Sequence, residues 1–389
     1  MALQNPIDST HAWSGTQSAV YKLDVSEVLS AILLDDTDFL SFIGVSGETA
    51  TETKHQWVED ALNAVTVKGN SGAFYLSAAN SAQVVITLSA SQAARVTAGT
   101  LLRDELSGKT EVLQVTARSG ISATVTRGYG STSPEAHAAG ATWRIIAHAR
   151  PQGMEGPKDE STARSFKYNF TQIFSKGVKI TGTAQAIEHY GVGAEDQYQI
   201  DLRMRELKRE LNHALIMGIR APSDVAATVY GTMGGLIEFA GLLNTTNINN
   251  TAETLTPTVL NAMAKQVFDA GGTPDFVVVG AVQKQKISLF DQEFRRSTMD
   301  TRRAGFTIEE FVTDLGVNLR IVLDRWMPVD VAVVGDSSRI KVLPLTGRAF
   351  FLEKLAKTGD AERWQIVGEY TAEFRNANET LAYHNKLKQ

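Results

Sequence analysis

The spacing of apolar residues changes several times along the chain, and each spacing predicts a different kind of structure. From Val25 to Leu33 apolar residues recur every three or four positions, which predicts an amphipathic helix. Residues 1–24 are polar and turn-rich over most of their length, and we expect an N-terminal arm. Three carboxylates lie within Asp35–Asp38. Because calcium loops spread their ligands over a longer turn, we interpret this run as one helix ending and the next being capped.

Residues 72–149 differ from the rest of the chain, with ten charged residues among 78. Short runs with β-strand composition, at 83–88, 111–116, 121–126 and 142–147, alternate there with glycine-containing turns. Strands at this spacing are typical of a small sandwich or barrel. The segment is long enough to have its own core, so we expect an inserted all-β domain over 72–149.

A connector over residues 150–165 leads into a strand pattern. Phe166, Tyr168 and Phe170 alternate with polar residues, which predicts a β-ribbon with one mostly aromatic face that continues through Val178–Thr181 and ends at Gly182. Such a ribbon has too little neighbouring chain to bury its aromatic face alone, so an adjacent subunit could cover it.

The strongest helical pattern in the chain follows the ribbon. Residues from Ile200 to Leu215 place apolar side chains on one face and charged side chains on the other. Counted from about Ala194 to Met217, the helix has roughly 24 residues and a length of about 35 Å. A helix of this length spans a domain, as a structural strut would.

The C-terminal part alternates between helical and strand patterns. Helices are predicted over 255–270 and 283–290. Strands are predicted at 276–279, 319–323, 331–334, 340–345, 349–352, 364–367 and 370–374. This succession predicts an α+β fold in which helices flank a sheet.

Composition narrows the class of protein. The 389 residues suffice for two or three domains, 43% are hydrophobic, and there is no cysteine, which excludes a disulfide scaffold and thiolate chemistry. The N-terminus lacks the pattern of a signal peptide, and no apolar run approaches the ~18 residues of a membrane span. The formal charge of −5 does not favour a protein that coats DNA.

A search for catalytic and metal-binding patterns returns none. None of the seven histidines shares an HExxH-type spacing. Gly191–Gly193 lacks the lysine and third glycine of a phosphate loop, and Gly44–Gly47 is followed by Glu48 where a nucleophile elbow needs glycine. We interpret His189 and His213 as capping or packing residues. The sequence therefore assigns no catalytic, cofactor-binding or metal-binding residue.

One basic cluster combines Arg295 and Arg296 with Arg302 and Arg303. Acidic residues interleave with these arginines, which favours a solvated surface loop. The alternative is an arginine contact with another subunit or with DNA.

Several segments, taken in order, resemble those of one protein family. They are Asp38–Leu40 with Gly44 and His55–Trp57, Asn169–Phe174, Thr181–Ala186, Glu206–Glu210, Asp269–Asp275 with Val279–Gly280, and Leu355–Glu362 with Glu369–Thr371. No single segment is specific. The ordered set, which covers about residues 25–65 and 165–385, resembles the major capsid proteins of tailed phages, the major head protein family. The insertion at 72–149 departs from the shorter family members.

The resemblance implies a Hong Kong 97-like capsid fold. Residues 1–24 would be the N-terminal arm, and 25–71 would hold a helix and the start of the extended loop and peripheral domain. Residues 150–224 would form the return of the extended loop and the spine helix, 225–345 the axial domain, and 346–389 the return to the peripheral domain with the C-terminal tail. The inserted domain would lie within the extended loop or at its base.

The resemblance also implies a structural protein rather than an enzyme. Copies would assemble into hexamers and pentamers, in the host cytoplasm, and form the icosahedral head of a virion around double-stranded DNA. The implied partners are other copies, the portal, scaffold or decoration proteins, and packaged DNA bound without sequence specificity, but no membrane. Two alternatives are another virion component of the tail or head completion, and an enzyme or surface-binding protein with 72–149 as its ligand-binding part.

Overall fold

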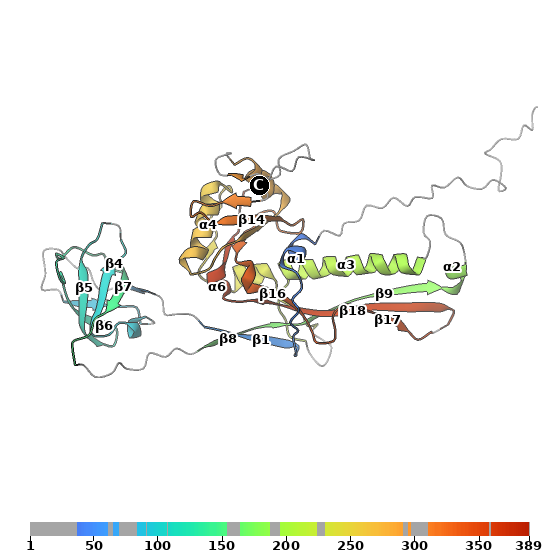
Figure 1. Cartoon of the computed structure of the whole chain (residues 1–389), viewed down its shortest axis with the longest axis horizontal. Coiled ribbons are helices and arrows are strands. Elements are labelled where there is room, and N and C mark those ends of the chain that lie inside the picture. Colours follow the sequence, from blue (N-terminus) through green and yellow to red (C-terminus); the bar gives the residue numbers. More distant parts are fainter. Residues whose placement is uncertain are drawn as a thin grey trace, which may run out of the picture. The chain divides into compact units, whose positions relative to one another are not determined.

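The computed structural model of the protein describes residues 37–60, 65–69, 84–90, 92–106, 108–153, 164–186, 195–223, 230–290, 295–296, 310–357 and 359–388 (Figure 1). The expected N-terminal arm and the helix expected to start at Val25 lie outside these residues. The chain divides into two compact units, one formed by Met1–Glu59 with Phe166–Gln389 and the other by Asp60–Ser165. We call them the main unit and the inserted unit.

The inserted unit is a small all-β domain. Its strands are β2 (Thr66–Lys68), β3 (Val85–Thr87), β4 (Thr100–Asp104), β5 (Val112–Ser119), β6 (Ser122–Thr126) and β7 (Thr142–His148), with one short helix, η1 (Ala93–Arg95). They are ordered β2-β7-β4-β5-β6-β3, and every pairing is antiparallel. Gly69 bridges to Leu88, and the Ser89 N–H donates to the Lys68 carbonyl at 2.8 Å. These contacts join the two edge strands, so the sheet closes as a barrel.

Alternation of apolar residues explains this barrel. Leu102, Leu113, Val125 and Trp143 point inward from four strands and form a core of their own with other buried residues. Gly120, at φ 58, allows the two-residue turn between β5 and β6. The predicted all-β character is confirmed. The unit is longer than the predicted 72–149, because β2 and the flanking residues from Asp60 and to Ser165 belong to it.

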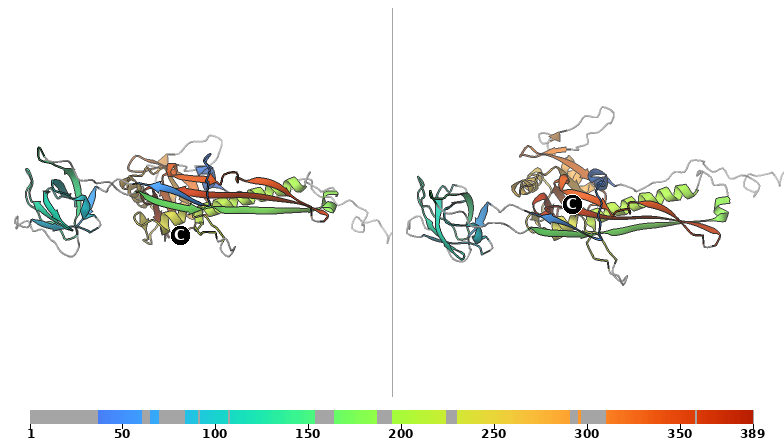
Figure 2. Two further views of the ribbon diagram at one scale, coloured as in Figure 1. Left: turned by 90° about the horizontal axis from the view of Figure 1, so that it is seen from below. Right: turned by 60° about the horizontal axis from the view of Figure 1, so that its bottom comes forward.

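The first sheet of the main unit is organised around one long strand. Strand β18 (Ala361–Phe374) pairs on one side with β9 (Gln172–Thr181) and on the other with β16 (Ile340–Pro344) and β17 (Phe351–Leu355). The predicted long helix is confirmed as α3 (Glu195–Met217), which runs along these strands in all views (Figures 1 and 2). Its apolar face, which includes Leu207, Leu211 and Leu215, is buried in the core of this unit.

The strand pattern after Ser165 was predicted incorrectly in one respect. The chain does not form one ribbon strand from Phe166 to Thr181. Strand β8 (Ser165–Phe170) pairs with β1 (Lys54–Glu59) in a separate two-stranded sheet, and β9 pairs with β18 instead. Within this chain the polar face of this segment is the buried one, since Asn169 and Thr171 are buried whereas Phe166 is 68% exposed. The reason is hydrogen bonding to distant segments.

The second sheet of the main unit has seven strands among the described residues. In order they are β10 (Ile248–Asn249), β19 (Leu381–His384), β15 (Ala332–Gly335), β11 (Phe276–Val279), β14 (Asn318–Leu323), β13 (Glu310–Val312) and β12 (Arg295–Arg296). Helices α4 (Pro257–Asp269) and α5 (Ala281–Ser288) accompany it. Strand β19 comes from the C-terminal end of the chain, so the last residues are not all part of the sheet that contains β18.

Local signals explain these elements. All four residues of β11 are buried, as an apolar run predicts for a central strand. The Thr256 hydroxyl accepts a hydrogen bond from the Val259 N–H and caps α4, and Pro257 is its first residue. The shorter helices are α1 (Asp38–Ile43), α2 (Gly182–Ala186), η2 (Glu238–Leu242), η4 (Ser337–Arg339) and α6 (Ala377–Thr380). In the described part of the chain, no helix is both long and apolar enough to cross a membrane.

Candidate assembly site: the ribbon base and the network of the inserted unit

The ribbon of β1 and β8 is joined to the rest of the main unit by polar side chains. We call the residues at this junction, Lys54, His55, Tyr168, Asn169 and Thr171, the ribbon base. Most of them are held by hydrogen bonds to elements far away in the sequence. The junction matters because the inserted unit lies in the chain between the two strands of this ribbon.

Asn169 uses all of its hydrogen-bonding capacity. Its amide nitrogen donates to the carbonyl oxygens of Gly234 (3.0 Å) and Ala372 (2.8 Å). Its amide oxygen accepts from the backbone N–H groups of Gly234 (2.7 Å) and Phe170 (2.9 Å). The side chain is completely buried, so these bonds replace the water that the amide would otherwise bind. Asn169 thus joins β8, the segment before η2, and β18.

His55 and Thr171 tie the ribbon base to carboxylates of β18. The His55 ring nitrogen Nε2 lies 2.5 Å from Glu373, whose other oxygen accepts from Arg375. Burial raises the pKa of Glu373, but the hydrogen bonds from His55 and Arg375 outweigh burial, so its pKa is lowered. The Thr171 hydroxyl donates to Glu369 at 2.6 Å. The carboxylates therefore act as charged acceptors for the ribbon.

Tyr168 lies between two cations at the ribbon base. The Lys54 ammonium is 4.5 Å and the Arg220 guanidinium 4.4 Å from the centre of its ring. Arg220 also donates to the Tyr168 carbonyl at 2.8 Å and pairs with Glu238. Burial raises the pKa of Glu238 in spite of this pairing. One aromatic residue of the predicted apolar face is thus covered by charged groups of its own chain.

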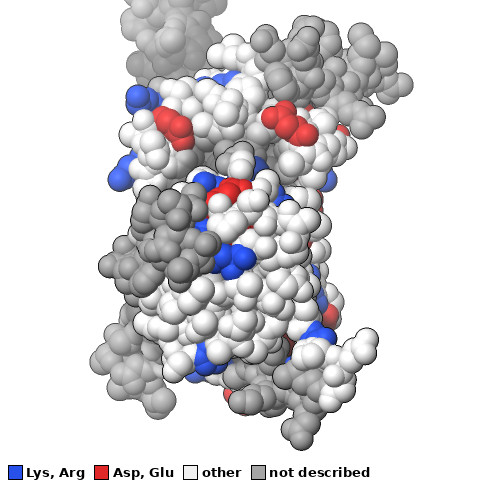
Figure 3. Space-filling model, turned by 90° about the vertical axis from the view of Figure 1, so that its left-hand side faces the viewer, with Lys and Arg blue, Asp and Glu red and all other residues white. Residues whose placement is uncertain are grey.

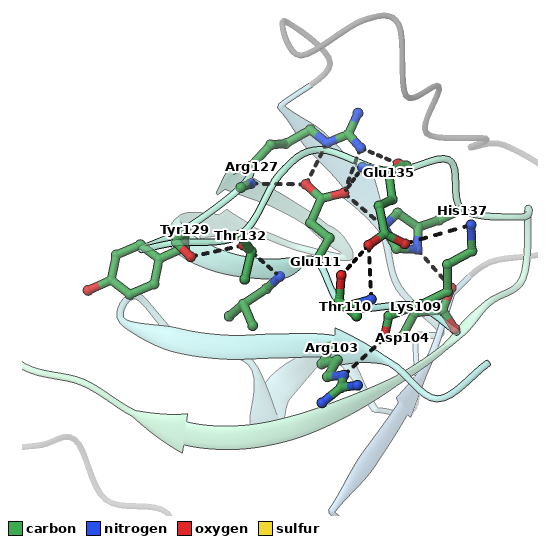
Figure 4. Close-up of polar contacts among 12 residues, drawn as sticks. Arg103, Asp104, Lys109, Thr110, Glu111, Arg127, Tyr129, Thr132, Glu135 and His137 are labelled. Atoms are coloured by element: carbon green, nitrogen blue, oxygen red, sulfur yellow. Dashed lines mark hydrogen bonds and ion pairs between the residues drawn. The ribbon is translucent and has the colours of Figure 1, made fainter. Parts of the chain in front are cut away.

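A second polar network lies inside the inserted unit and centres on Glu111 (Figure 4). The Glu111 carboxylate accepts from Arg127 through two nitrogens, at 3.0 and 2.8 Å, and from the backbone N–H groups of Gly128 (3.0 Å) and Glu135 (2.6 Å). Both side chains of the Arg127–Glu111 pair are buried, at 1% and 0% exposure. The carboxylate therefore holds both ends of the loop from Gly128 to Glu135.

His137 extends this network. Its Nδ1 lies 2.8 Å from Asp104 and its Nε2 lies 2.9 Å from Glu111, and the ring packs against Trp143 with centroids 4.8 Å apart. A ring nitrogen that faces a carboxylate acts as a donor when that carboxylate is ionised. The ring thereby connects β4, the residue before β5, and the loop before β7.

The hydrogen bonds determine the charge state of Glu111. Burial raises the pKa of this carboxyl, but the bonds from Arg127, Glu135, His137 and Gly128 together lower it to about 2. Glu111 is therefore ionised at neutral pH although it is buried. Removal of one partner would leave an uncompensated buried charge, which makes such networks costly to break.

Some of the other residues discussed in the sequence analysis lie in the described part of the chain. His213 lies on α3 with its ring 4.2 Å from that of Trp326, and burial lowers its pKa, which agrees with the predicted packing role. Arg295 and Arg296 form β12, which pairs with β13. His189, Gly191–Gly193, Arg302 and Arg303 lie outside the described residues. Within those residues, no group of three or more His, Cys, Asp or Glu could hold a metal ion.

Sequence reasoning missed both polar networks. A signal was present in the inserted unit, because Asp104, Glu111, Arg127 and Glu135 are four of the ten charged residues in a segment otherwise poor in charge. Charges kept in such a segment are candidates for buried pairs. The face drawn in Figure 3 shows scattered basic and acidic residues among mostly uncharged ones, and no continuous basic patch is visible on its coloured part.

Comparison with known proteins decides the family. The family described as SU10 major capsid protein matches residues 9–386, which is nearly the whole chain. The chain belongs to this family. Its members are structural capsid proteins, so membership identifies a phage capsid protein that associates with copies of itself, in agreement with the resemblance found in the sequence.

Individual relatives are distant. The major capsid protein of Escherichia phage Phieco32 is 23% identical over 279 residues, which cover 59% of this chain and 78% of the relative. The capsid of the native GTA particle is 9% identical with a TM-score of 0.50 and full coverage of both chains. A chain from Mycobacterium phage Cain is 11% identical with a TM-score of 0.46 and 98% coverage of both. At 9% identity the likeness to the GTA capsid shows the fold alone, which is Hong Kong 97-like.

We predict that Asn169→Ala destabilises the main unit by about 3 kcal/mol, because it leaves buried backbone groups of Gly234, Ala372 and Phe170 without partners. Asn169→Asp should be at least as harmful, since it places a carboxylate oxygen opposite two carbonyl oxygens. Urea unfolding of the full chain measures the change. Asn250→Ala, at an exposed position, should stay within about 0.5 kcal/mol. Equal stabilities of the Asn169 and Asn250 variants would contradict the role of Asn169.

We predict that the inserted unit loses stability in acid as Glu111 takes up a proton. Its pKa in the folded chain is lowered to about 2 from 4.5, so its contribution is present above pH 4.5 and disappears as the pH falls toward 2. The shift corresponds to roughly 3 kcal/mol. Unfolding followed at Trp143 between pH 6 and pH 2.5 tests this. Glu111→Gln should be less stable at pH 6 and less dependent on pH; a variant with the same pH profile as the parent would refute the assignment.

Proposed function

We propose that this chain is the shell subunit of a tailed-phage head, in which hexamers and pentamers of the chain enclose double-stranded DNA. The observation that carries the proposal is the match of residues 9–386 to a major capsid protein family. A further support is the number of large apolar residues that the main unit leaves exposed, among them Phe166 at 68%, Ile173 at 58% and Leu352 at 44%. Large apolar side chains left exposed in this number are candidates for contacts with other subunits.

The two sheets of the main unit correspond to the two domains of a shell subunit, one peripheral and one axial. We propose that α3 and the sheet around β18 form the peripheral domain, with α3 as the spine helix, and that the seven-stranded sheet forms the axial domain at the centre of each capsomer. The ribbon of β1 and β8 is then the extended loop. Head-to-tail contacts between identical subunits close into rings, which is how one chain can build both hexamers and pentamers.

The charge of the chain bears on its contact with DNA. A net charge of −5 gives no general attraction for phosphate, so packaged DNA would lie against the inner wall without sequence-specific contacts. Portal, scaffold and decoration proteins would complete the head. Assembly in the host cytoplasm fits a chain without cysteine, since that compartment does not sustain disulfides.

The inserted unit has the properties of an added domain. It has its own closed barrel and core, and the chain enters and leaves it through the ribbon. We propose that it lies on the outer surface of the shell and stabilises contacts between capsomers.

Expression of the chain tests the shell directly. We expect closed particles of many subunits in electron micrographs and in the void volume of a sizing column. A stable monomer that does not assemble even with the other head proteins of its phage would refute the proposal. Open tubes or rings without shells would instead favour the tail or head-completion alternative.

Excision separates the role of the inserted unit from that of the main unit. Replacement of Asp60–Ser165 by a short Gly-Ser linker should convert β1 and β8 into a simple hairpin and leave the main unit folded, since each unit has its own core. We expect shells from this variant to break at lower urea concentration than parent shells. Insoluble subunits would mean that the inserted unit is needed for folding of the main unit.

A further inference from the structure

The outer edge of β9 offers backbone groups for pairing. The Gly182 N–H donates to the Asp360 carbonyl at 3.2 Å, which continues the register in which Thr181 pairs with Ala361. In an antiparallel pair, every second residue directs its N–H and C=O toward the partner strand. The even-numbered residues of β9 therefore face β18. The odd-numbered ones direct both groups outward; they are Ile173, Ser175, Gly177, Lys179 and Thr181.

Two further hydrogen bonds agree with this alternation. Glu369, which lies opposite Ile173, uses both backbone groups on the far side, where its carbonyl accepts from Leu345 and its N–H donates to Arg348, each at 2.9 Å. Thr171 continues the odd series, and its N–H donates to the Thr53 carbonyl at 2.8 Å. One end of the outer edge is thus already paired with an extended segment.

Beyond Thr171 no strand of the described residues covers the outer edge. Two hollows lie between β9 and α3, one of about 730 Å³ beside Ile173 and Met217, and one of about 580 Å³ beside Lys179 and Arg203. Ile173 is 58%, Met217 45% and Ile219 60% exposed at the first hollow. The first hollow therefore has exposed apolar side chains in a mixed lining, and the lining of the second includes two basic residues.

The edge has few of the features that normally prevent strand addition. Its ten residues contain no proline, and the register with β18 has no bulge. Of its two lysines, Lys176 pairs with Glu210 on α3. In the part of the chain that the structure describes, no strand pairs with this edge from Ile173 onward. A long, regular edge of this kind is a template for another strand.

We propose that the outer edge of β9 pairs with an extended segment of a second copy of this chain. The inference rests on the proposed shell function, in which copies lie side by side. The chain itself carries a suitable segment, since β17 forms the opposite edge of the same sheet and exposes Phe351, Leu352 and Leu355. Through Gln365 the register places Glu353 on the same face as Lys179, so on this face the two edges offer opposite charges. On the other face Lys176 and Lys354 are paired with Glu210 and Glu362. Joined edge to edge, copies make a heterologous contact that can close into a ring.

Hydrogen exchange of shells and unassembled subunits tests the pairing with a built-in control. The amides of Phe174, Lys176 and Val178 should be protected in both states, because they pair with β18. The amides of Ser175, Gly177 and Lys179 should exchange at least tenfold more slowly in shells than in subunits. Equal exchange of these outward amides in both states would overturn the proposal.

A proline substitution tests whether the pairing is needed. Ser175→Pro removes one outward N–H and no bond to β18, and proline is tolerated at a strand edge. We expect subunits with parent-like circular dichroism whose yield of shells falls at least tenfold, whereas Ser175→Ala assembles normally. Normal shells from a folded Ser175→Pro subunit would overturn the proposal. If the parent chain forms no shells, the proposed function itself fails, so the two failures can be told apart.

Discussion

The main unit depends on a single buried amide, that of Asn169. Three of its four hydrogen bonds reach residues 65 or 203 positions away in the sequence, and they meet where β8 ends and β9 is about to begin. Because a buried amide is costly unless all its groups are paired, only one arrangement of the three segments satisfies it. That arrangement determines where the ribbon leaves the unit and where β9 joins β18.

The other contacts at the ribbon base follow from this arrangement. Once Asn169 turns inward, the alternation of the strand places Tyr168 and Phe170 on the opposite face, where Lys54 and Arg220 cover the Tyr168 ring. His55 and Thr171 then lie within reach of Glu373 and Glu369 on β18. The ribbon is therefore positioned by ionic and polar bonds. Such bonds have defined geometry, so they set the direction in which the ribbon leaves the main unit.

In the inserted unit, buried polar residues hold a loop in place rather than a ribbon. A barrel of this size has a small core, and the loop from Gly128 to Glu135 has little apolar surface to hold it in place. The buried Glu111 supplies acceptors for both ends of that loop, and Arg127 and His137 compensate its charge. A buried pair of this kind specifies one conformation more than it adds stability. The same unit was recognised from its sequence as an all-β domain, although the network within it was not.

The sequence by itself determined the elements that depend on local periodicity. The long helix, four of the six strands of the inserted unit (β3, β5, β6 and β7) and the succession of capsid-like segments follow from the spacing of residues close together in the chain. Strands β2 and β4 were not predicted. Only the tertiary structure decided which strands pair. The pattern from Phe166 to Thr181 is compatible with one ribbon, and its aromatic face was expected to be covered by an adjacent subunit. Hydrogen bonds from Asn169 and Thr171 to residues more than sixty positions away turn the polar face inward and divide the strand. Local alternation shows that two faces differ, but the partners that satisfy a buried polar group decide which face turns inward.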